Sequence, residues 1–596
     1  MDAETTTLNR RPVRAVFALL IAYVLLGLVL GGGCGGGGGG ASSAALIYTT
    51  EWGSATASIA GESQRISIYT LDDRLVQTIL LNRETTGAQQ HRFSLSGSGT
   101  FRIVAELFSG ANASGVRTGL IDTAVAVRGS TTFSSAVGVE PTSVSVTPNN
   151  VTIRIPESRR FFALAKVDDR AVFTAPNGFE WQTLGGTATV NSEGVVSAES
   201  AGQGSVRATH VDTGLSGSAV FSVQPFSAER RKWTVLVFMN AGNDLHPFST
   251  LNVNQMEQVA DNPDVRFVVQ WKQSRQVWPT STFDGTRRIL VRPDNTPAIV
   301  SEVVQDMGTG VDMGRPETLR DFINWGKTYY PADRYVLVVW NHGNGWRRSA
   351  HGLPSRAVSY DDQFGSSIQA WELSQALGDH RFDIVAWDAS LMQMIEVAYE
   401  VKDHADYVVG SQESPPGEGY PYHLVFAPFR NNPDLPTATL SKGFVDGMLA
   451  FYGNSRRITQ SVLDTSKLGT LGTRVSALGN ALAANRTVIP TEIQTVRNQA
   501  QAYGPTSVRF FRDLDHLSQL LLQLVTVPSV VQAAQDVRTA IQDAVVWNGN
   551  NVNSPNSRGV SVDFSPGSVF TIGQADYQQL RFAAETTWDE FLAVAP

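Results

Sequence analysis

The sequence predicts a multidomain protein in which N-terminal all-β sandwiches precede an α/β domain with a largely parallel sheet. The 596 residues exceed what one hydrophobic core supports, and 42% of them are apolar, as in globular domains. Short alternating apolar runs between Gly, Ser and Asn clusters fill residues 44–223. From residue 233 onward, apolar strands alternate with helical patterns, which indicates a sheet buried on both faces.

The charge of the chain argues against one class of partner. The formal net charge is -8, and no basic run occurs beyond the N-terminus. A nucleic-acid-binding domain needs a basic face to neutralise phosphates. We therefore expect no nucleic-acid partner.

Residues 1–34 have the composition of an export signal and are left out of fold reasoning. A cluster of arginines precedes an uninterrupted apolar stretch at 15–30. The following Gly31-Gly32-Gly33-Cys34 resembles a bacterial lipobox, in which the cysteine is acylated, although Gly31 stands where leucine is usual. The alternative is an uncleaved anchor, because the apolar stretch and its glycines approach the roughly 20 residues that span a bilayer.

Both alternatives predict an exported protein of the bacterial cell envelope, lipid-anchored or membrane-tethered. Residues 35–43 form a Gly-rich tether that would leave the rest of the chain mobile above the membrane. Cys34 is the single cysteine, so no disulfide can form within the chain.

Two β-sandwiches are expected before the α/β domain, over residues 44–137 and 140–224. In the second, the runs 143–146 and 151–155 flank a Pro-Asn-Asn turn, and Trp181 is expected in the core. Its later strands are similar to the closing strands of bacterial Ig-like domains of the second type, which are usually spacers or adhesive units. We expect a spacer, because neither sandwich clusters titratable groups.

The α/β domain is expected over residues 230–596. Ligands of parallel sheets bind beyond the carboxyl ends of the strands. His342 and Ser390 both come just after predicted strands, so we expect them on the rim where a site can form. The expected strands are residues 233–239, 265–270, 335–340, 382–387 and 407–409, and the expected helices are 317–327, 391–402 and most of 431–551, including 517–525 and 530–545.

A series of short motifs follows this α/β pattern in order and spacing. They are 233–240, Asn243-Asp244-Leu245, Trp340-Asn341-His342-Gly343-Asn344-Gly345-Trp346, 382–389, Leu391-Met392, 396–400, 411–413, 416–422 and 559–564. Together they resemble the clostripain family of bacterial cysteine endopeptidases. The resemblance implies a caspase-like sheet, a catalytic histidine at His342, a nucleophile position at Ser390, and preference for a basic residue before the scissile bond.

Other residues near this pair have expected roles. The backbone amide of Gly343 is the candidate for an oxyanion hole, because glycine allows close approach to a substrate carbonyl. The resemblance implies that Asp388 and Glu418 form the floor of a pocket for arginine or lysine, with Glu418 one methylene longer than the usual Asp. The alternative for Asp388 is a cap on the helix expected near Leu391.

Two further features follow from the resemblance alone. Zymogens of the family cut themselves after a basic residue between the histidine and the nucleophile, which makes Arg356 a candidate self-cleavage position; the alternative is an ordinary exposed loop. The family's calcium dependence is a possibility for this chain, but no D-x-D-x-D-G loop occurs, and no metal ligand or other cofactor is assigned.

Serine at position 390 changes the chemistry. A cysteine is a few per cent thiolate at neutral pH and strongly nucleophilic, whereas a serine needs a base within about 2.6 to 3.2 Å that a third group orients. No carboxylate lies beside His342 in the sequence, although Asp244, Asp361 or Asp362 could approach it in space.

Three hypotheses follow. The first is an exported clostripain-like pseudoprotease that binds peptides or proteins containing arginine or lysine. The second is an active endopeptidase that uses Ser390 and His342. The third is a cell-surface adhesion or scaffold protein in which the β-sandwiches carry the function.

Overall fold

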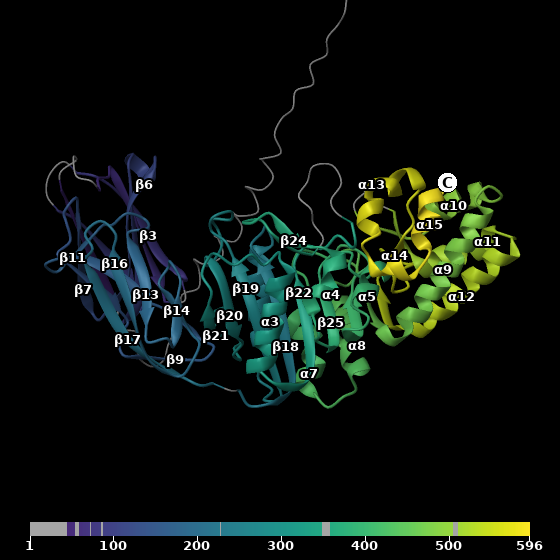
Figure 1. Cartoon of the computed structure of the whole chain (residues 1–596), viewed down its shortest axis with the longest axis horizontal. Helices are drawn as coiled ribbons and strands as arrows, with labels where there is room; N and C mark the ends of the chain where they lie inside the picture. Colours follow the sequence, from purple (N-terminus) through teal and green to yellow (C-terminus); the bar gives the residue numbers. More distant parts are fainter. Residues whose placement is uncertain are drawn as a thin grey trace, which may run out of the picture.

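The computed structural model describes residues 44–53, 59–71, 73–84, 88–226, 228–347, 358–504 and 510–596. The expected lipidation site Cys34 and the expected self-cleavage position Arg356 lie outside the described residues. Figure 1 shows the β-rich N-terminal part at one end, the α/β sheet in the middle and a helical lobe at the other end. Among the described residues, no helix is both long and apolar enough to cross a membrane.

The β-rich part contains four sheets. Its strands are β1 (Ala44–Trp52), β2 (Ser63–Thr70), β3 (Leu75–Asn82), β4 (Ala88–Leu95), β5 (Gly99–Phe108), β6 (Arg117–Val127), β7 (Ser130–Val137), β8 (Ser143–Thr147), β9 (Val151–Arg154), β10 (Ser158–Arg160), β11 (Phe162–Val167), β12 (Arg170–Val172), β13 (Phe179–Leu184), β14 (Ala188–Val190), β15 (Val195–Ala198), β16 (Gly202–His210) and β17 (Ser216–Gln224). The sheet orders are β4-β1-β7-β12-β11-β8, β3-β2-β5-β6, β10-β15-β14 and β13-β16-β17-β9.

This part has two hydrophobic cores, and we call residues 44–137 the first β unit and residues 140–224 the second β unit. One core contains residues of the first unit together with Ala171 and Phe173, and the other contains residues of the second unit, with Trp181 half-buried against it. The units are nevertheless joined, because β7 pairs in parallel with β12. The six-stranded sheet therefore runs through both units.

The α/β domain is built on a nine-stranded mixed sheet. Its strands are β18 (Arg231–Ala241), β19 (Val265–Gln273), β20 (Gly285–Leu290), β21 (Glu302–Asp306), β22 (Ala332–Trp340), β25 (Phe382–Asp388), β26 (Ala405–Gly410), β27 (Thr459–Asp464) and β30 (Val545–Asn550). The order is β21-β20-β19-β18-β22-β25-β26-β27-β30. The five strands from β19 to β26 are parallel, whereas each of the two outer strands on either side pairs antiparallel with its inner neighbour. The largely parallel sheet expected from the sequence is therefore found only in the five central strands.

Helices cover both faces of this sheet because its strands are apolar on both sides. Leu236 and Phe238 point into one core, and their neighbours Val235 and Val237 point into the other. The first core takes α3 (Pro316–Tyr329), α4 (Leu373–Leu377) and α5 (Ile395–Glu400), and the second takes α2 (His246–Glu257), α6 (Tyr422–Val425), α7 (Ala427–Asn431) and α8 (Thr437–Tyr452).

A helical lobe extends the first of these cores. It contains α9 (Leu468–Asn485), α10 (Pro490–Gln499), α11 (Leu514–Leu524), α12 (Pro528–Ala544), α13 (Gly567–Tyr577), α14 (Arg581–Glu585) and α15 (Trp588–Val594), with the small sheet β28 (Ala502–Tyr503), β29 (Phe511–Asp513) and β31 (Ser561–Asp563). Its buried leucine and valine side chains belong to the same cluster as those of α3. The lobe is therefore continuous with the α/β domain.

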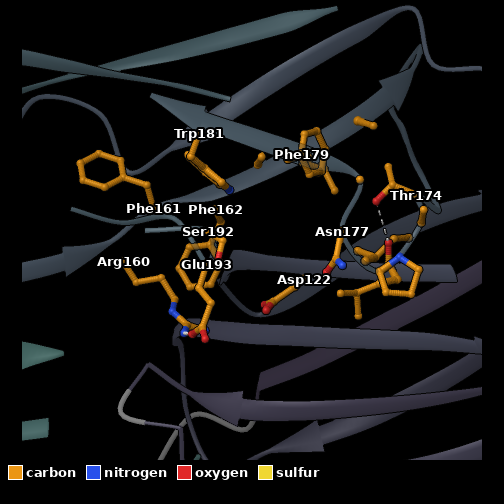
Figure 2. A pocket seen from close by; sticks show the side chains of 18 of the residues that line it. Asp122, Arg160, Phe161, Phe162, Thr174, Asn177, Phe179, Trp181, Ser192 and Glu193 are labelled. Atoms are coloured by element: carbon orange, nitrogen blue, oxygen red, sulfur yellow. Dashed lines mark hydrogen bonds and ion pairs between the residues drawn. The ribbon is translucent and has the colours of Figure 1, made fainter. Parts of the chain in front are cut away.

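The β-rich part meets the α/β domain through charged groups. Asp73 forms ion pairs with Arg102 and Arg287, and its backbone carbonyl accepts a hydrogen bond from Arg275 at 3.1 Å. Burial raises the pKa of Asp73, but the two paired arginines outweigh it and lower the pKa to about 2. A cavity of about 430 Å³ lies at this junction (Figure 2). The expectation that the β units cluster no titratable groups is therefore wrong.

Buried carboxyl groups make the pH dependence of stability a test of the fold. Burial raises the pKa of Glu396 to about 8, of Glu400 to about 7 and of Asp513 to about 6. These three carboxyls then bind more protons in the folded chain than in the unfolded chain, so their contribution to stability is complete below about pH 4 and is lost as the pH rises to about 8. We expect the urea midpoint, followed by tryptophan fluorescence, to fall between about pH 5 and about pH 8.5.

Each of these groups contributes at most about 1.4 kcal/mol per pH unit within its window. Glu396→Gln mimics the protonated carboxyl and should flatten the profile, whereas the same change at the exposed Glu199 should leave it unaltered. A midpoint that rises over this range would contradict the assignment.

Candidate active site

The candidate active site lies where the adjacent strands β18, β22 and β25 end. Their carboxyl ends surround a cavity of about 150 Å³. His342 and Ser390 share this cavity, although the sequence separates them widely. The cavity is lined by Leu245, Trp340, Asn341, His342, Asp388, Ala389, Ser390, Pro415, Pro416, Gly417 and Gly419.

A carboxylate holds the His342 ring. The Nε2 atom of His342 lies 2.5 Å from Asp244 Oδ1. Of the other two carboxylates considered from the sequence, Asp361 pairs with Lys272, and Asp362 accepts a hydrogen bond from the Trp278 indole. Asp244 is therefore the group that orients the imidazole. Its contact leaves Nδ1 as the ring nitrogen available to a ligand in the cavity.

Ser390 lies in a turn and not at the start of a helix. Among the described residues, no hydrogen bond joins its hydroxyl to His342. The next residue, Leu391, has φ +64°, a left-handed conformation that is strained for leucine, and its amide donates to the Glu413 carbonyl at 3.3 Å. Helix α5 begins only at Ile395, without a side-chain cap. The expected helix start near Leu391, and with it a capping role for Asp388, is wrong.

Gly343 packs against the backbone of this turn. A Cβ atom at position 343 would lie 2.9 Å from the Ser390 nitrogen and closer still to the Ser390 carbonyl oxygen. Contact at that distance would force the turn to move. The position therefore requires glycine for close packing, and the proposed role of its amide in an oxyanion hole remains a prediction.

Asp388 is a buried carboxyl at the edge of the cavity. Its Oδ1 accepts a hydrogen bond from the Tyr420 amide at 2.9 Å, and its Oδ2 accepts one from the Tyr422 hydroxyl at 3.0 Å. Burial raises the pKa of Asp388 to about 7, and these two hydrogen bonds oppose the rise. Asp388 therefore changes charge near neutral pH. The sequence motif contained both tyrosines, but sequence reasoning assigned them no role.

Glu418, the second acidic residue expected in the pocket floor, does not share the environment of Asp388. It is half-buried and is not among the residues that line the cavity. Its backbone carbonyl accepts a hydrogen bond from Asn252 at 3.0 Å. Asp388 and Glu418 are therefore not equivalent, and only Asp388 lies in the cavity wall.

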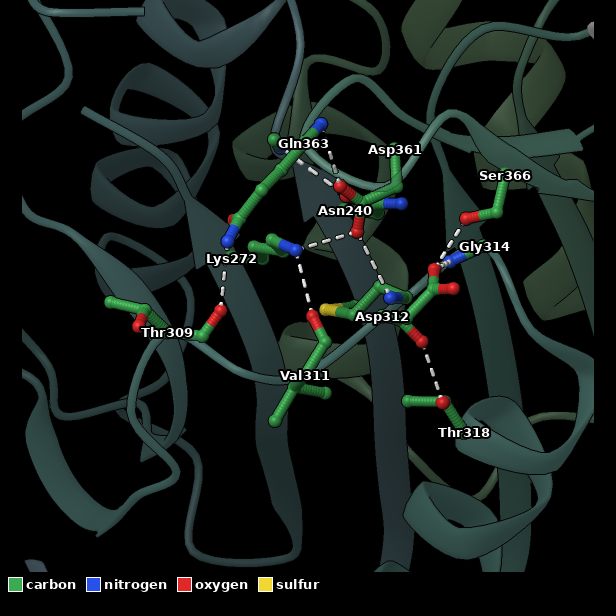
Figure 3. A network of polar contacts seen from close by, with 12 residues as sticks. Asn240, Lys272, Thr309, Val311, Asp312, Gly314, Thr318, Asp361, Gln363 and Ser366 are labelled. Atoms are coloured by element: carbon green, nitrogen blue, oxygen red, sulfur yellow. Dashed lines mark hydrogen bonds and ion pairs between the residues drawn. The ribbon is translucent and has the colours of Figure 1, made fainter. Parts of the chain in front are cut away.

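A buried polar network holds the loops of the site in place (Figure 3). The Lys272 ammonium donates to Asp361 at 2.6 Å, and both side chains are fully buried. Burial lowers the pKa of Lys272 and raises that of Asp361, while their attraction opposes both shifts. The Asn240 amide donates to Ser359 O at 3.2 Å, and the Asn243 amide donates to Tyr360 O at 2.8 Å.

This network joins the end of β18 to the hairpin of β23 (Val358–Asp361) and β24 (Ser366–Ile368). Ser359 has φ +55°, so a second strained residue lies beside the site. Within the described residues, no group of three or more His, Cys, Asp or Glu side chains could hold a metal ion. No residue of the site is therefore assigned to calcium.

The fold and the cavity define an α/β domain with a parallel centre and with a histidine and a serine together at the strand ends. The clostripain family model matches residues 237–594. This match covers more than half of the chain and includes every residue that lines the cavity. The chain belongs to the clostripain family, and the resemblance inferred from the motifs is confirmed.

Individual relatives are distant. Clostripain of Hathewaya histolytica is 26% identical over 221 residues, which are 33% of this chain and 42% of clostripain. An inactive zymogen C11 protease of Parabacteroides distasonis is 18% identical over 60% of this chain and 99% of its own, with a TM-score of 0.47. A secreted C11 cysteine protease of Bacteroides thetaiotaomicron with an irreversible peptide inhibitor is 21% identical over 56% and 92%, with a TM-score of 0.43.

The buried pair of Lys272 and Asp361 should be essential for stability. Lys272→Met leaves the Asp361 carboxylate buried without its cation, which costs about 3 to 5 kcal/mol. The measurement is urea unfolding of the full chain. As a control, Lys442→Met removes an exposed partner of Asp446 and should cost less than about 1 kcal/mol. Equal losses in the two variants would contradict this account.

Proposed function

We propose that the α/β domain binds peptides containing a basic residue and does not cleave them. The observation that carries the proposal is the serine at the nucleophile position, whose hydroxyl has no hydrogen bond to His342 among the described residues. A serine hydroxyl attacks a carbonyl only when a base accepts its proton. The cavity keeps room for a peptide side chain but lacks an activated nucleophile.

Asp388 gives the cavity its preference for arginine or lysine. Asp388 lines the cavity together with Gly417 and Gly419, and the Gly419 backbone packs closely against the Asp388 carboxyl. A guanidinium or ammonium group in this cavity would stabilise the ionised form of Asp388. Glu418 lies in the chain between Gly417 and Gly419, which both line the cavity, and adds a second negative charge close to it.

The protein acts outside the cytoplasm, at the bacterial cell envelope. The arginine cluster, the apolar stretch and Gly31-Gly32-Gly33-Cys34 support export, with attachment through a lipid on Cys34 or through an uncleaved N-terminal helix. A secreted protein among the family's solved structures is consistent with this location. Peptides and proteins with exposed arginine or lysine are the partners.

A second candidate function is peptide cleavage by Ser390. The observation that favours it is the 2.5 Å contact between Asp244 and His342, which supplies the third group that a serine mechanism needs. In this candidate, His342 would accept the Ser390 proton through Nδ1 once substrate closes the gap between them. Catalytic hydrogen bonds of this kind commonly tighten only when substrate binds.

Hydrolysis assays separate the two candidates. We expect no cleavage of arginyl or lysyl peptides by the wild type or by Ser390→Ala, and measurable cleavage by Ser390→Cys, because a thiolate tolerates a base that is not hydrogen-bonded to it. The measurement is release of a fluorogenic amine. Cleavage by the wild type that disappears in Ser390→Ala would overturn the proposal in favour of the serine peptidase.

Peptide binding should depend on pH through Asp388. Below pH 7 the protonated carboxyl offers no charge to a cation, so affinity for an arginine-containing peptide should rise with pH, at most about tenfold per unit, and level off above about pH 7. Isothermal titration calorimetry between about pH 5 and about pH 8 measures this profile.

Asp388→Asn is the matched variant, because it keeps the size of the side chain and removes the titration. It should bind the peptide more weakly and with no pH dependence over this range. A wild-type affinity that does not change with pH would show that Asp388 does not face the bound cation.

A further inference from the structure

One loop connects the second β unit to the candidate active site. Residues 307–315 join β21 to α3 and form neither helix nor strand. Side chains of the second β unit hold this loop from one side, and side chains beneath the active site hold it from the other.

In the second β unit, Glu193 makes the main contacts with the 307–315 loop. Its Oε1 accepts hydrogen bonds from the Thr309 amide at 3.2 Å and from the Thr309 hydroxyl at 2.6 Å. Its Oε2 accepts one from Arg160 at 2.8 Å, and Figure 2 shows these two side chains facing each other beside the junction cavity. The Ser158 hydroxyl donates to the Asp306 carbonyl at 2.6 Å, just before the loop. The β unit thus holds the start of the loop.

On its other side, the 307–315 loop is hydrogen-bonded to side chains of the buried network around Lys272 and Asp361 (Figure 3). The Gln363 amide donates to Thr309 O at 3.0 Å, and the Lys272 ammonium donates to Val311 O at 2.7 Å. Lys272 is the same side chain that pairs with Asp361. The position of the loop and the position of the β23–β24 hairpin are therefore coupled.

The β23–β24 hairpin is also hydrogen-bonded to the segment that carries Asp244, the residue in contact with His342. The amide of Asp362, which follows Asp361, donates to the Gly242 carbonyl at 3.0 Å. Gly242 lies two residues before Asp244, whose carboxylate contacts the His342 ring. Hydrogen bonds and three short chain segments thus run without a break from Glu193 to His342.

We propose that Glu193 is a positioning residue for His342, so that the second β unit is a structural support of the active site and not a spacer. The inference rests on the proposed function only in taking His342 as the residue that faces a bound peptide. Without Glu193, the 307–315 loop loses two hydrogen bonds. The His342 ring is then held less firmly in its contact with Asp244.

The test uses the full chain with Ser390→Cys and measures how fast iodoacetamide alkylates the thiol at position 390, with the modified peptide identified by mass spectrometry. A nearby histidine raises the thiolate fraction and therefore the alkylation rate. Adding Glu193→Ala should slow the reaction between about 2-fold and about 30-fold. Amide hydrogen exchange over residues 307–315 and 240–245 should become faster in the same variant.

Three variants make the result specific. Glu193→Gln keeps an acceptor for Thr309 and should restore most of the rate. Glu199→Ala, at an exposed position of the same unit, should leave the rate unchanged. Thr309→Val removes one donor, and combining it with Glu193→Ala should add less than the sum of the two effects, because both remove the same contact.

Unchanged alkylation and unchanged hydrogen exchange in Glu193→Ala would overturn the proposal. A slower reaction without faster exchange in the loop would also overturn it, because the effect would then not travel through residues 307–315. Neither readout requires peptide binding. If the wild type binds no basic peptide, the proposed function fails while the coupling between Glu193 and His342 is still decided.

Discussion

The buried ion pair of Lys272 and Asp361 is the constraint on which the site depends. Lys272 is the penultimate residue of β19, and Asp361 is the last residue of β23, so their contact fixes the end of the sheet against the β23–β24 hairpin. Two charges without solvent need full hydrogen bonding to be tolerated. The Val311 carbonyl and the Met313 and Gln363 amides supply it. These contacts hold the 307–315 loop and the β23–β24 hairpin in place beside the site.

The hydroxyl of Ser390 contributes little to this scaffold. Gly343 meets the backbone of Ser390, Leu391 bonds to the chain beyond β26, and Asp388 is held by two tyrosines. None of these contacts involves the hydroxyl of Ser390. The architecture of the site is consequently the same for sulfur and for oxygen at that position, and a family match alone does not decide whether a bond is broken there. The chemistry depends on one atom, while the fold depends on its neighbours.

The five central strands and the shared position of His342 and Ser390 were predictable, because uninterrupted apolar strands and the strand-end rule are local signals. β27 and β30 lay in a segment whose pattern was mostly helical, and both are short strands added antiparallel at an edge. The turn at Leu391 overrode a helical pattern, because its amides bond to a neighbouring loop. The contacts of Asp244 and the charged junction around Asp73 join residues far apart in the chain, and no spacing rule in one sequence brings such residues together.

The parallel pairing of β7 with β12 has a consequence for how this protein can be divided. Each strand covers an edge that the other would otherwise expose, with Ser135 opposite Ala171 in the register. A chain cut between residues 137 and 140 would leave unpaired backbone donors and acceptors on both fragments. Open strand edges recruit other chains and lead to aggregation. The two β units thus share a sheet through β7 and β12, and Ala171 and Phe173 of the second unit pack in the core of the first, so a soluble fragment must keep both units or neither.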